Sequence, residues 1–249
     1  FRWPAGMIYP AHDFSWVSTS SGGVISPVLD GGGQPNINAS NWQIEIDSHF
    51  NAIAAQSWSS RCTKMNVSNE LIDPLQPDGW RVHPWATASG SGLTWLTYAF
   101  NKAHALWPNT PLGLCQDLTE QVPDSYYTSL RSWFLTHLQD LLNAGAPISY
   151  VDLQGHMAFS RGYDAASHKA FLQAIRSMGL KIVVGEFDIR TGNTGVYVPA
   201  NYTNDGYDQT AEYLTAQYLD TILPFVDGGE FLCWGMSDKY NAWSASERP

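Results

Sequence analysis

Two glutamates stand at the ends of apolar segments that have the composition of buried strands. Residues 65–69 run directly into Glu70, and residues 181–185 run into Glu186, with Asp188 two positions further on. Because side chains alternate along a strand, Glu186 and Asp188 are predicted to share one face. The carboxyl ends of parallel strands are where α/β enzymes place their chemistry. A pair of carboxylates at such ends is suited to cleaving a glycosidic bond.

The elements that must position these carboxylates follow an alternating pattern. Apolar strand candidates alternate with amphipathic helical stripes, which indicates a parallel sheet covered by helices. The expected strands lie near 6–10, 64–69, 111–115, 149–153, 181–185 and 230–234. Ser40 and Gln43 predict a capping box at the start of the helix that lies between the first two of these strands. The pattern gives six βα units, two fewer than a closed (β/α)8 barrel has.

Length and composition limit the classes of function. The chain has 249 residues without an internal repeat or linker, so a single domain over residues 1–249 is expected. A net charge of −10 argues against nucleic acid and anionic membranes as partners. Eleven Trp, 12 Tyr and 10 Phe, with only 14% charged residues, suit a protein that stacks flat neutral ligands. We expect no cofactor, and we see no metal-ligand spacing.

Cysteines and sequons bear on the compartment. The three cysteines are expected to be buried thiols rather than a disulfide framework: Cys62, Cys115 and Cys233. Three Asn-x-Ser/Thr sequons begin at Asn38, Asn66 and Asn201. Asn38 and Asn201 lie in polar loops and could carry glycans, whereas Asn66 falls within a buried strand. These features favour a secreted, glycosylated protein.

Several short motifs follow one another in a specific order along the chain. They are Val67-Ser68-Asn69-Glu70-Leu71-Ile72-Asp73-Pro74, Cys115-Gln116-Asp117, Leu153-Gln154-Gly155-His156, Gly185-Glu186-Phe187-Asp188 and Cys233-Trp234-Gly235-Met236, followed by Trp243. In this order and at these distances they resemble the fourth- to eighth-strand motifs of glycoside hydrolase family 10, the retaining endo-β-1,4-xylanases. The resemblance runs from about residue 62 to the end of the chain. It implies a (β/α)8 TIM-barrel type of fold.

The same resemblance implies a role for each site residue. Glu70 would be the acid/base and Glu186 the nucleophile of a double displacement. His156 would donate to Glu186 while Asp188 orients the imidazole. The residues expected to bind xylan or xylo-oligosaccharides are Asn69, His12, Gln154, His156, Trp234 and Trp243.

The beginning of the chain departs from the family pattern. Gly6, His12 and the Ser-Trp-Val from residue 15 agree with the third-strand motif, but Met7 and Ala11 replace an expected histidine and tryptophan. In this register the first two strands and the final helix are absent. We therefore expect weak activity from this chain alone, and a second chain or an oligomer contact that completes the barrel.

Two alternatives to a xylanase remain open from the sequence. The first is a related retaining glycosidase that acts on another β-linked glycan, because the first sugar-binding strands differ or are missing. The second belongs to a different class of protein, namely a carbohydrate-binding barrel remnant that no longer turns over.

Overall fold

The computed structural model describes residues 37–57, 59–82, 84–121, 125–158, 161–190 and 207–234. The strand predicted at residues 6–10 lies outside these ranges. Contacts divide the chain into two compact units. The first contains residues up to Cys115 together with Trp133–Tyr150, and the second contains Gln116–Ser132 and the chain from Val151 onward. Each unit is described by itself.

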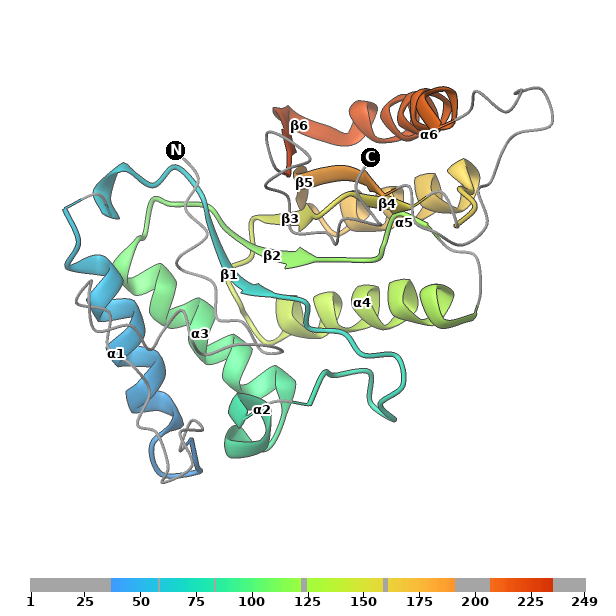
Figure 1. Cartoon of the computed structure of the whole chain (residues 1–249). Coiled ribbons are helices and arrows are strands. Elements are labelled where there is room, and N and C mark those ends of the chain that lie inside the picture. Colours follow the sequence, from blue (N-terminus) through green and yellow to red (C-terminus); the bar gives the residue numbers. More distant parts are fainter. Residues whose placement is uncertain are drawn as a thin grey trace. The chain divides into compact units, whose positions relative to one another are not determined.

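In the first unit two parallel strands are covered by helices (Figure 1). Strand β1 (Met65–Asn69) pairs with β2 (Leu112–Gln116), and every residue of both is buried. The helices of this unit include α1 (Trp42–Ala54), α2 (Pro84–Ser89) and α3 (Gly92–Leu106), which pack on one another, and α3 contacts β1. Burial of both strand faces explains why their sequences are apolar without alternation.

Helix α3 shows how the sequence sets this packing. Ser91 caps its first turn by accepting a hydrogen bond from the Thr94 amide. Its buried side chains recur three and four residues apart, so they form one stripe: Trp95, Leu96, Ala99, Phe100 and Ala103. The stripe packs toward β1 and α1.

The start of α1 differs from the predicted capping box. The helix begins at Trp42, and Asn41 at the N-cap makes no side-chain capping bond. The Ser40 hydroxyl instead donates to Asn38 Oδ1, which also accepts from the Ser40 amide. A local Asx-type turn therefore holds the hydroxyl that the capping box would have needed.

The second unit is built around β5 (Lys181–Arg190). One edge of β5 pairs in parallel with β4 (His156–Ala158), and β6 (Val226–Cys233) also pairs with it in parallel. Helices α5 (Ala165–Ser177) and α6 (Tyr207–Ile222) pack together, and α5 contacts β5. Strand β5 runs five residues beyond its predicted end at 185, so Glu186 and Asp188 lie within the strand.

Three elements contribute residues to both units. The boundary divides β2 between Cys115 and Gln116, and it also divides helix α4 (Ser125–Asn143) and strand β3 (Tyr150–Leu153). The six strands found in the described ranges are hydrogen-bonded in the order β1-β2-β3-β5-β4, with β6 on β5. Strand β3 matches the strand predicted near 149–153, whereas β4, which follows after an interruption at Gln154 and Gly155, was not predicted.

Candidate active site

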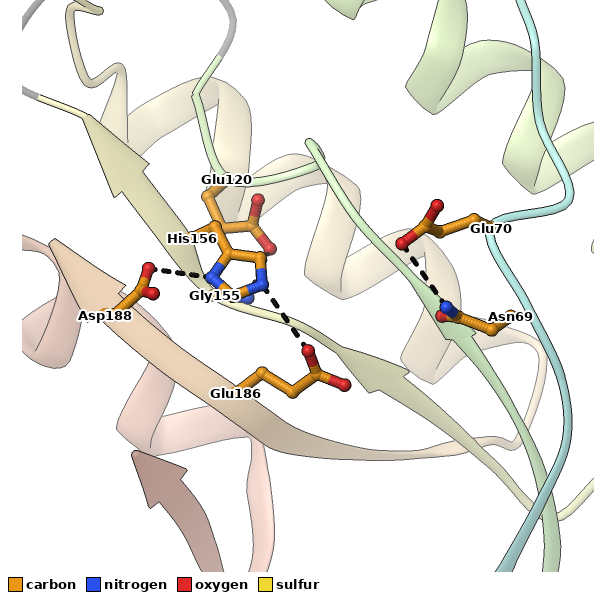
Figure 2. A network of polar contacts seen from close by, with 7 residues as sticks. All are labelled: Asn69, Glu70, Glu120, Gly155, His156, Glu186 and Asp188. Atoms are coloured by element: carbon orange, nitrogen blue, oxygen red, sulfur yellow. Dashed lines mark hydrogen bonds and ion pairs between the residues drawn. The ribbon is translucent and has the colours of Figure 1, made fainter. Parts of the chain in front are cut away.

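The second unit brings three predicted site residues into contact around one imidazole (Figure 2). His156 Nε2 lies 3.4 Å from Glu186 Oε2, and His156 Nδ1 lies 2.7 Å from Asp188 Oδ1. All three side chains are largely buried, with 8% of His156 and 12% of each carboxylate side chain exposed. Because both carboxylates reach the same ring, they share one face of β5, as strand alternation predicts.

The charge of this cluster follows from its geometry. Burial by itself would lower the pKa of His156. The contacts with Asp188 and Glu186, and the charges of Asp188 and Glu120, outweigh burial and raise it to about 9. At neutral pH the ring is therefore an imidazolium held between two carboxylates. A cation in this position orients Glu186 through its Oε2 atom. The side of the carboxylate that faces away from the ring is left for contact with a ligand.

A break in the strand directs His156 toward β5. The Gln154 carbonyl accepts from the Glu186 amide at 2.9 Å, and the Gly155 carbonyl accepts from the Asp188 amide at 3.4 Å. Gly155 adopts φ +86, which L side chains rarely do. A Cβ there would lie 3.0 Å from Val184 Cγ1. Both the turn and the close packing therefore require glycine at this position.

Glu120 is a buried acid beside this break that the sequence analysis missed. It follows β2, has no exposed surface, and accepts the Gly155 amide on Oε1 at 2.8 Å. Burial raises the pKa of Glu120, although the Gly155 hydrogen bond acts in the opposite direction. Arg131 holds the same loop by donating to the carbonyls of Thr119 and Glu120. The sequence signal is an acid three residues after Asp117, just beyond the motif Cys115-Gln116-Asp117.

The first unit contains the other predicted catalytic carboxylate. Glu70 directly follows β1, and its amide donates to the Cys115 carbonyl at 3.0 Å. Its carbonyl accepts from Arg81 Nε at 2.7 Å, and its Oε1 accepts from Asn69 Nδ2 at 3.3 Å. Asn69 is fully buried, whereas Glu70 is half-buried. The backbone is thus fixed from two sides while part of the carboxylate remains accessible.

Backbone strain occurs at the carboxyl ends of two strands. In the described ranges the non-glycine residues with positive φ are Glu70 (φ 52) and Leu118 (φ 57). Glu70 follows the end of β1 and Leu118 lies two residues after the end of β2. Such conformations cost on the order of 1–3 kcal/mol and gather at functional sites. The strain therefore agrees with chemistry at these strand ends.

Of the remaining predicted binding residues, the structure describes Gln154 and Trp234. Gln154 is 3% exposed, at the strand break. Trp234 is 42% exposed, its ring centroid lies 6.4 Å from that of His156, and its amide donates to the Phe187 carbonyl. It offers an apolar wall next to the Glu186 cluster. His12 and Trp243 lie outside the described residues.

The sequence matches the model of a known protein family. Residues 12–249 match the model of Glycosyl hydrolase family 10. The chain belongs to glycosyl hydrolase family 10. Comparison with curated protein sequences gives no significant match.

Solved structures similar to this family 10 chain include several xylanases. The intracellular xylanase of Thermoanaerobacterium saccharolyticum, a mutant in complex with xylotriose, has a TM-score of 0.66 and 18% identity, over 89% of this chain and 64% of that one. Native xylanase 10B of Thermotoga maritima gives 0.68 and 19%, over 86% and 63%. Xylanase B of Clostridium stercorarium gives 0.65 and 20%, over 86% and 64%.

These similarities establish the fold as the (β/α)8-barrel type of family 10 xylanases, with a parallel sheet covered by helices. The described residues hold six strands of it, because β3 and β4 are counted separately. The chain spans just under two thirds of the length of the solved xylanases. That the chain forms a single domain remains a prediction.

The predictions about the cysteines and the glycosylation sequons are confirmed in part. Cys62 and Cys115 are buried as predicted, but Cys233 is exposed, because it ends β6 beside Trp234. Asn66 is buried and accepts a hydrogen bond from Tyr150, in line with its predicted unsuitability for a glycan, while Asn38 is exposed.

Within the described ranges, no group of three or more His, Cys, Asp or Glu side chains is arranged to hold a metal ion. None of the helices in these ranges has the length and apolar character needed to cross a membrane.

Proposed function

We propose that this chain is a retaining glycoside hydrolase that cleaves internal β-1,4-xylosidic bonds of xylan. The observation that carries the proposal is the contact between His156 and Glu186, with His156 fixed from its other side by Asp188. A carboxylate held by an oriented imidazolium, in the carboxyl-terminal half of a barrel strand, has the position expected of a glycosidase nucleophile.

The proposed reaction has two steps. In the first, Glu186 forms a bond to the anomeric carbon while the bond from that carbon to the glycosidic oxygen breaks, and Glu70 gives its proton to the leaving oxygen. In the second, Glu70 takes a proton from water, the water oxygen attacks the anomeric carbon, and Glu186 is released as a carboxylate. Such a pair of carboxyl groups works across a gap of about 5–5.5 Å.

Glu70 is suited to the acid/base role by its surroundings. Its main chain is fixed by the Cys115 carbonyl and by Arg81, while its side chain is half-buried and contacts Asn69. Because the backbone is fixed and the carboxyl is partly accessible, the carboxyl can transfer its proton to the leaving group in a defined orientation. We assign Asn69 to the sugar 2-hydroxyl, by family resemblance.

The substrate assignment rests on composition, on Trp234 and on family membership. Trp234 presents an exposed indole beside the Glu186 cluster, as the wall of a sugar subsite would. The solved neighbours are xylanases, and one of them holds xylotriose. Secretion, and a second chain or oligomer contact that completes the barrel, also remain proposals.

The proposal is tested by trapping the intermediate. An activated 2-fluoro-xylobioside should esterify Glu186, because the fluorine slows both steps while the good leaving group lets the first proceed. Peptide mass spectrometry locates the label. Glu186→Gln should abolish labelling, whereas Glu212→Gln, at an exposed carboxylate of α6 in the same unit, should leave it unchanged.

The alternatives give different outcomes in the same experiment. Label on another residue, or an inverted anomeric product by NMR, would refute the mechanism. Hydrolysis of a different β-glycan, but not of xylan, would favour another substrate. Binding of xylo-oligosaccharides by calorimetry without labelling or turnover would identify a binding remnant.

A further inference from the structure

Glu120 occupies an unusual position for an acid. It lies in the loop after β2, has no exposed surface, and belongs to neither of the predicted catalytic motifs. Oε1 accepts hydrogen bonds from the Gly155 amide at 2.8 Å and from Thr119 Oγ1 at 3.3 Å. Oε2 has no hydrogen-bond partner in the described part of the chain. An ionisable group buried in this way costs stability, so its presence calls for a physical explanation.

The bond from Glu120 acts on Gly155, the residue that directly precedes His156 in the break between β3 and β4. It holds the N–H of the Gln154–Gly155 peptide, whose carbonyl accepts from the Glu186 amide. The Asp188 amide holds the carbonyl of the next peptide, which joins Gly155 to His156. With both in place, His156 is aimed between Glu186 and Asp188 (Figure 2).

The groups that face His156 come from three segments. Glu186 and Asp188 approach from β5, Trp234 lies beyond the end of β6, and Glu120 lies in the loop after β2. Glu120 acts on the ring at longer range than the two β5 carboxylates, through its charge and through Gly155. Burial raises the pKa of Glu120, and its hydrogen bond from the Gly155 amide acts in the opposite direction.

We propose that Glu120 is a positioning residue for the glycosidase site, which holds the Gly155 amide so that His156 stays in contact with Glu186. The inference rests on the proposed function only for its catalytic consequence. The geometric part concerns His156 itself and can be tested without turnover.

Two substitutions separate geometry from charge. Glu120→Gln keeps an oxygen acceptor at the same position, whereas Glu120→Leu keeps the approximate volume and removes the acceptor. We expect Glu120→Leu to lower kcat on xylotriose about 10²-fold with little change in KM, the effect of misplacing a group that acts in the transition state. Glu120→Gln should restore kcat to within a few-fold of wild type.

The independent readout is the ring of His156. In ¹⁵N-histidine-labelled protein, with the signal assigned by its loss in His156→Gln, the wild-type ring should titrate near pH 9. Both substitutions remove the Glu120 charge and should lower this titration, Glu120→Leu further than Glu120→Gln, and only Glu120→Leu should change the Nε2 signal. Tyr218→Phe is the control, because the Tyr218 hydroxyl packs near Gly155 without bonding to it and its removal should leave the ring unchanged.

Each outcome either supports or overturns the positioning role of Glu120. If Glu120→Leu lowers thermal stability but leaves the His156 titration and kcat unchanged, the role is merely structural and the inference is overturned. If the ring responds as expected but no variant hydrolyses any glycan, the inference stands and the proposed function fails. If Glu120→Leu does not fold, Glu120→Asp draws the acceptor back by about 1.5 Å and should shift the titration in the same direction.

Discussion

His156 Nδ1 lies 2.7 Å from Asp188 Oδ1, while Nε2 of the same ring lies 3.4 Å from Glu186 Oε2. The shorter contact is the one to the residue assigned no direct role in bond cleavage. Asp188 therefore fixes the ring, and the ring in turn orients Glu186. Side-chain alternation places both carboxylates on one face of β5, and the break at Gly155 supplies the histidine that joins them.

Removing the Asp188 charge should uncouple this arrangement. We expect Asp188→Asn to lower kcat by about 10- to 100-fold with a smaller change in KM, the range seen when a group that orients a working side chain is lost. The His156 titration should move below about 9, because its strongest partner no longer carries charge. Steady-state kinetics and ¹⁵N NMR check the two parts. An unchanged titration would contradict the assignment of Asp188.

The His156 cluster predicts a specific dependence of stability on pH. The pKa of His156 is about 9 in the folded chain against 6.5 in the unfolded one, so the folded state binds the proton more tightly. Its contribution is fully present below about pH 6.5 and is lost as pH rises through about 9. From the size of the shift it amounts to at most about 3–4 kcal/mol. Urea unfolding at several pH values measures it, and His156→Gln should flatten the curve in this window.

Substitution of Gly155 should be costly for two reasons. Gly155→Ala places a Cβ at positive φ and within 3.0 Å of Val184 Cγ1. We expect a loss of about 2–4 kcal/mol in unfolding free energy and a fall in kcat, because the His156 peptide must shift. Gly179→Ala is the matched control, with φ +82 and nothing within 4 Å of the added Cβ. It should cost only about 1–2 kcal/mol and leave kcat unchanged. Equal costs in denaturant unfolding would show that space around Gly155 is unimportant.

Trp234 should contribute to binding rather than to folding. We expect Trp234→Ala to weaken the affinity for xylo-oligosaccharides by about 0.5–1.5 kcal/mol, the scale of aromatic contacts beyond area burial. Calorimetry with the Glu186→Gln variant measures this without turnover. Leu232→Ala is the control, since Leu232 is as exposed as Trp234, at 44% against 42%, and lies on the same segment. Similar losses for both would argue against a sugar wall at Trp234.

Glu70→Ala should distinguish an acid/base from a structural carboxylate. Substrates whose leaving group needs protonation should lose activity by roughly 10²- to 10⁴-fold, while activated aryl glycosides lose much less in the first step. Azide should partly restore turnover, because it attacks the intermediate without a general base. A variant equally impaired on both substrate types, with no response to azide, would assign Glu70 to structure.

The sequence alone determined the features that depend on short-range order. Buried parallel strands have continuous apolar segments, so four strands in the described ranges were predicted within a few residues of where they begin. The two-residue spacing of Glu186 and Asp188 was enough to place them on one face, because the strand period is two. The ordered motifs identified the family. The start of α1 was predicted wrongly, because Asn38 competes for the hydroxyl of Ser40.

Only the tertiary structure decided which distant side chains meet. The contact of His156 with Glu186 spans 30 residues of sequence, and that of Glu120 with Gly155 spans 35. The sequence analysis took the first from family resemblance and missed the second. Glu120 lies in a loop, where no side-chain alternation predicts its direction. Its partner is a backbone amide, which has no signature in the sequence. Its burial and its partner depend on how the loop after β2 packs against the break between β3 and β4, and such packing is set by long-range contacts rather than by local composition.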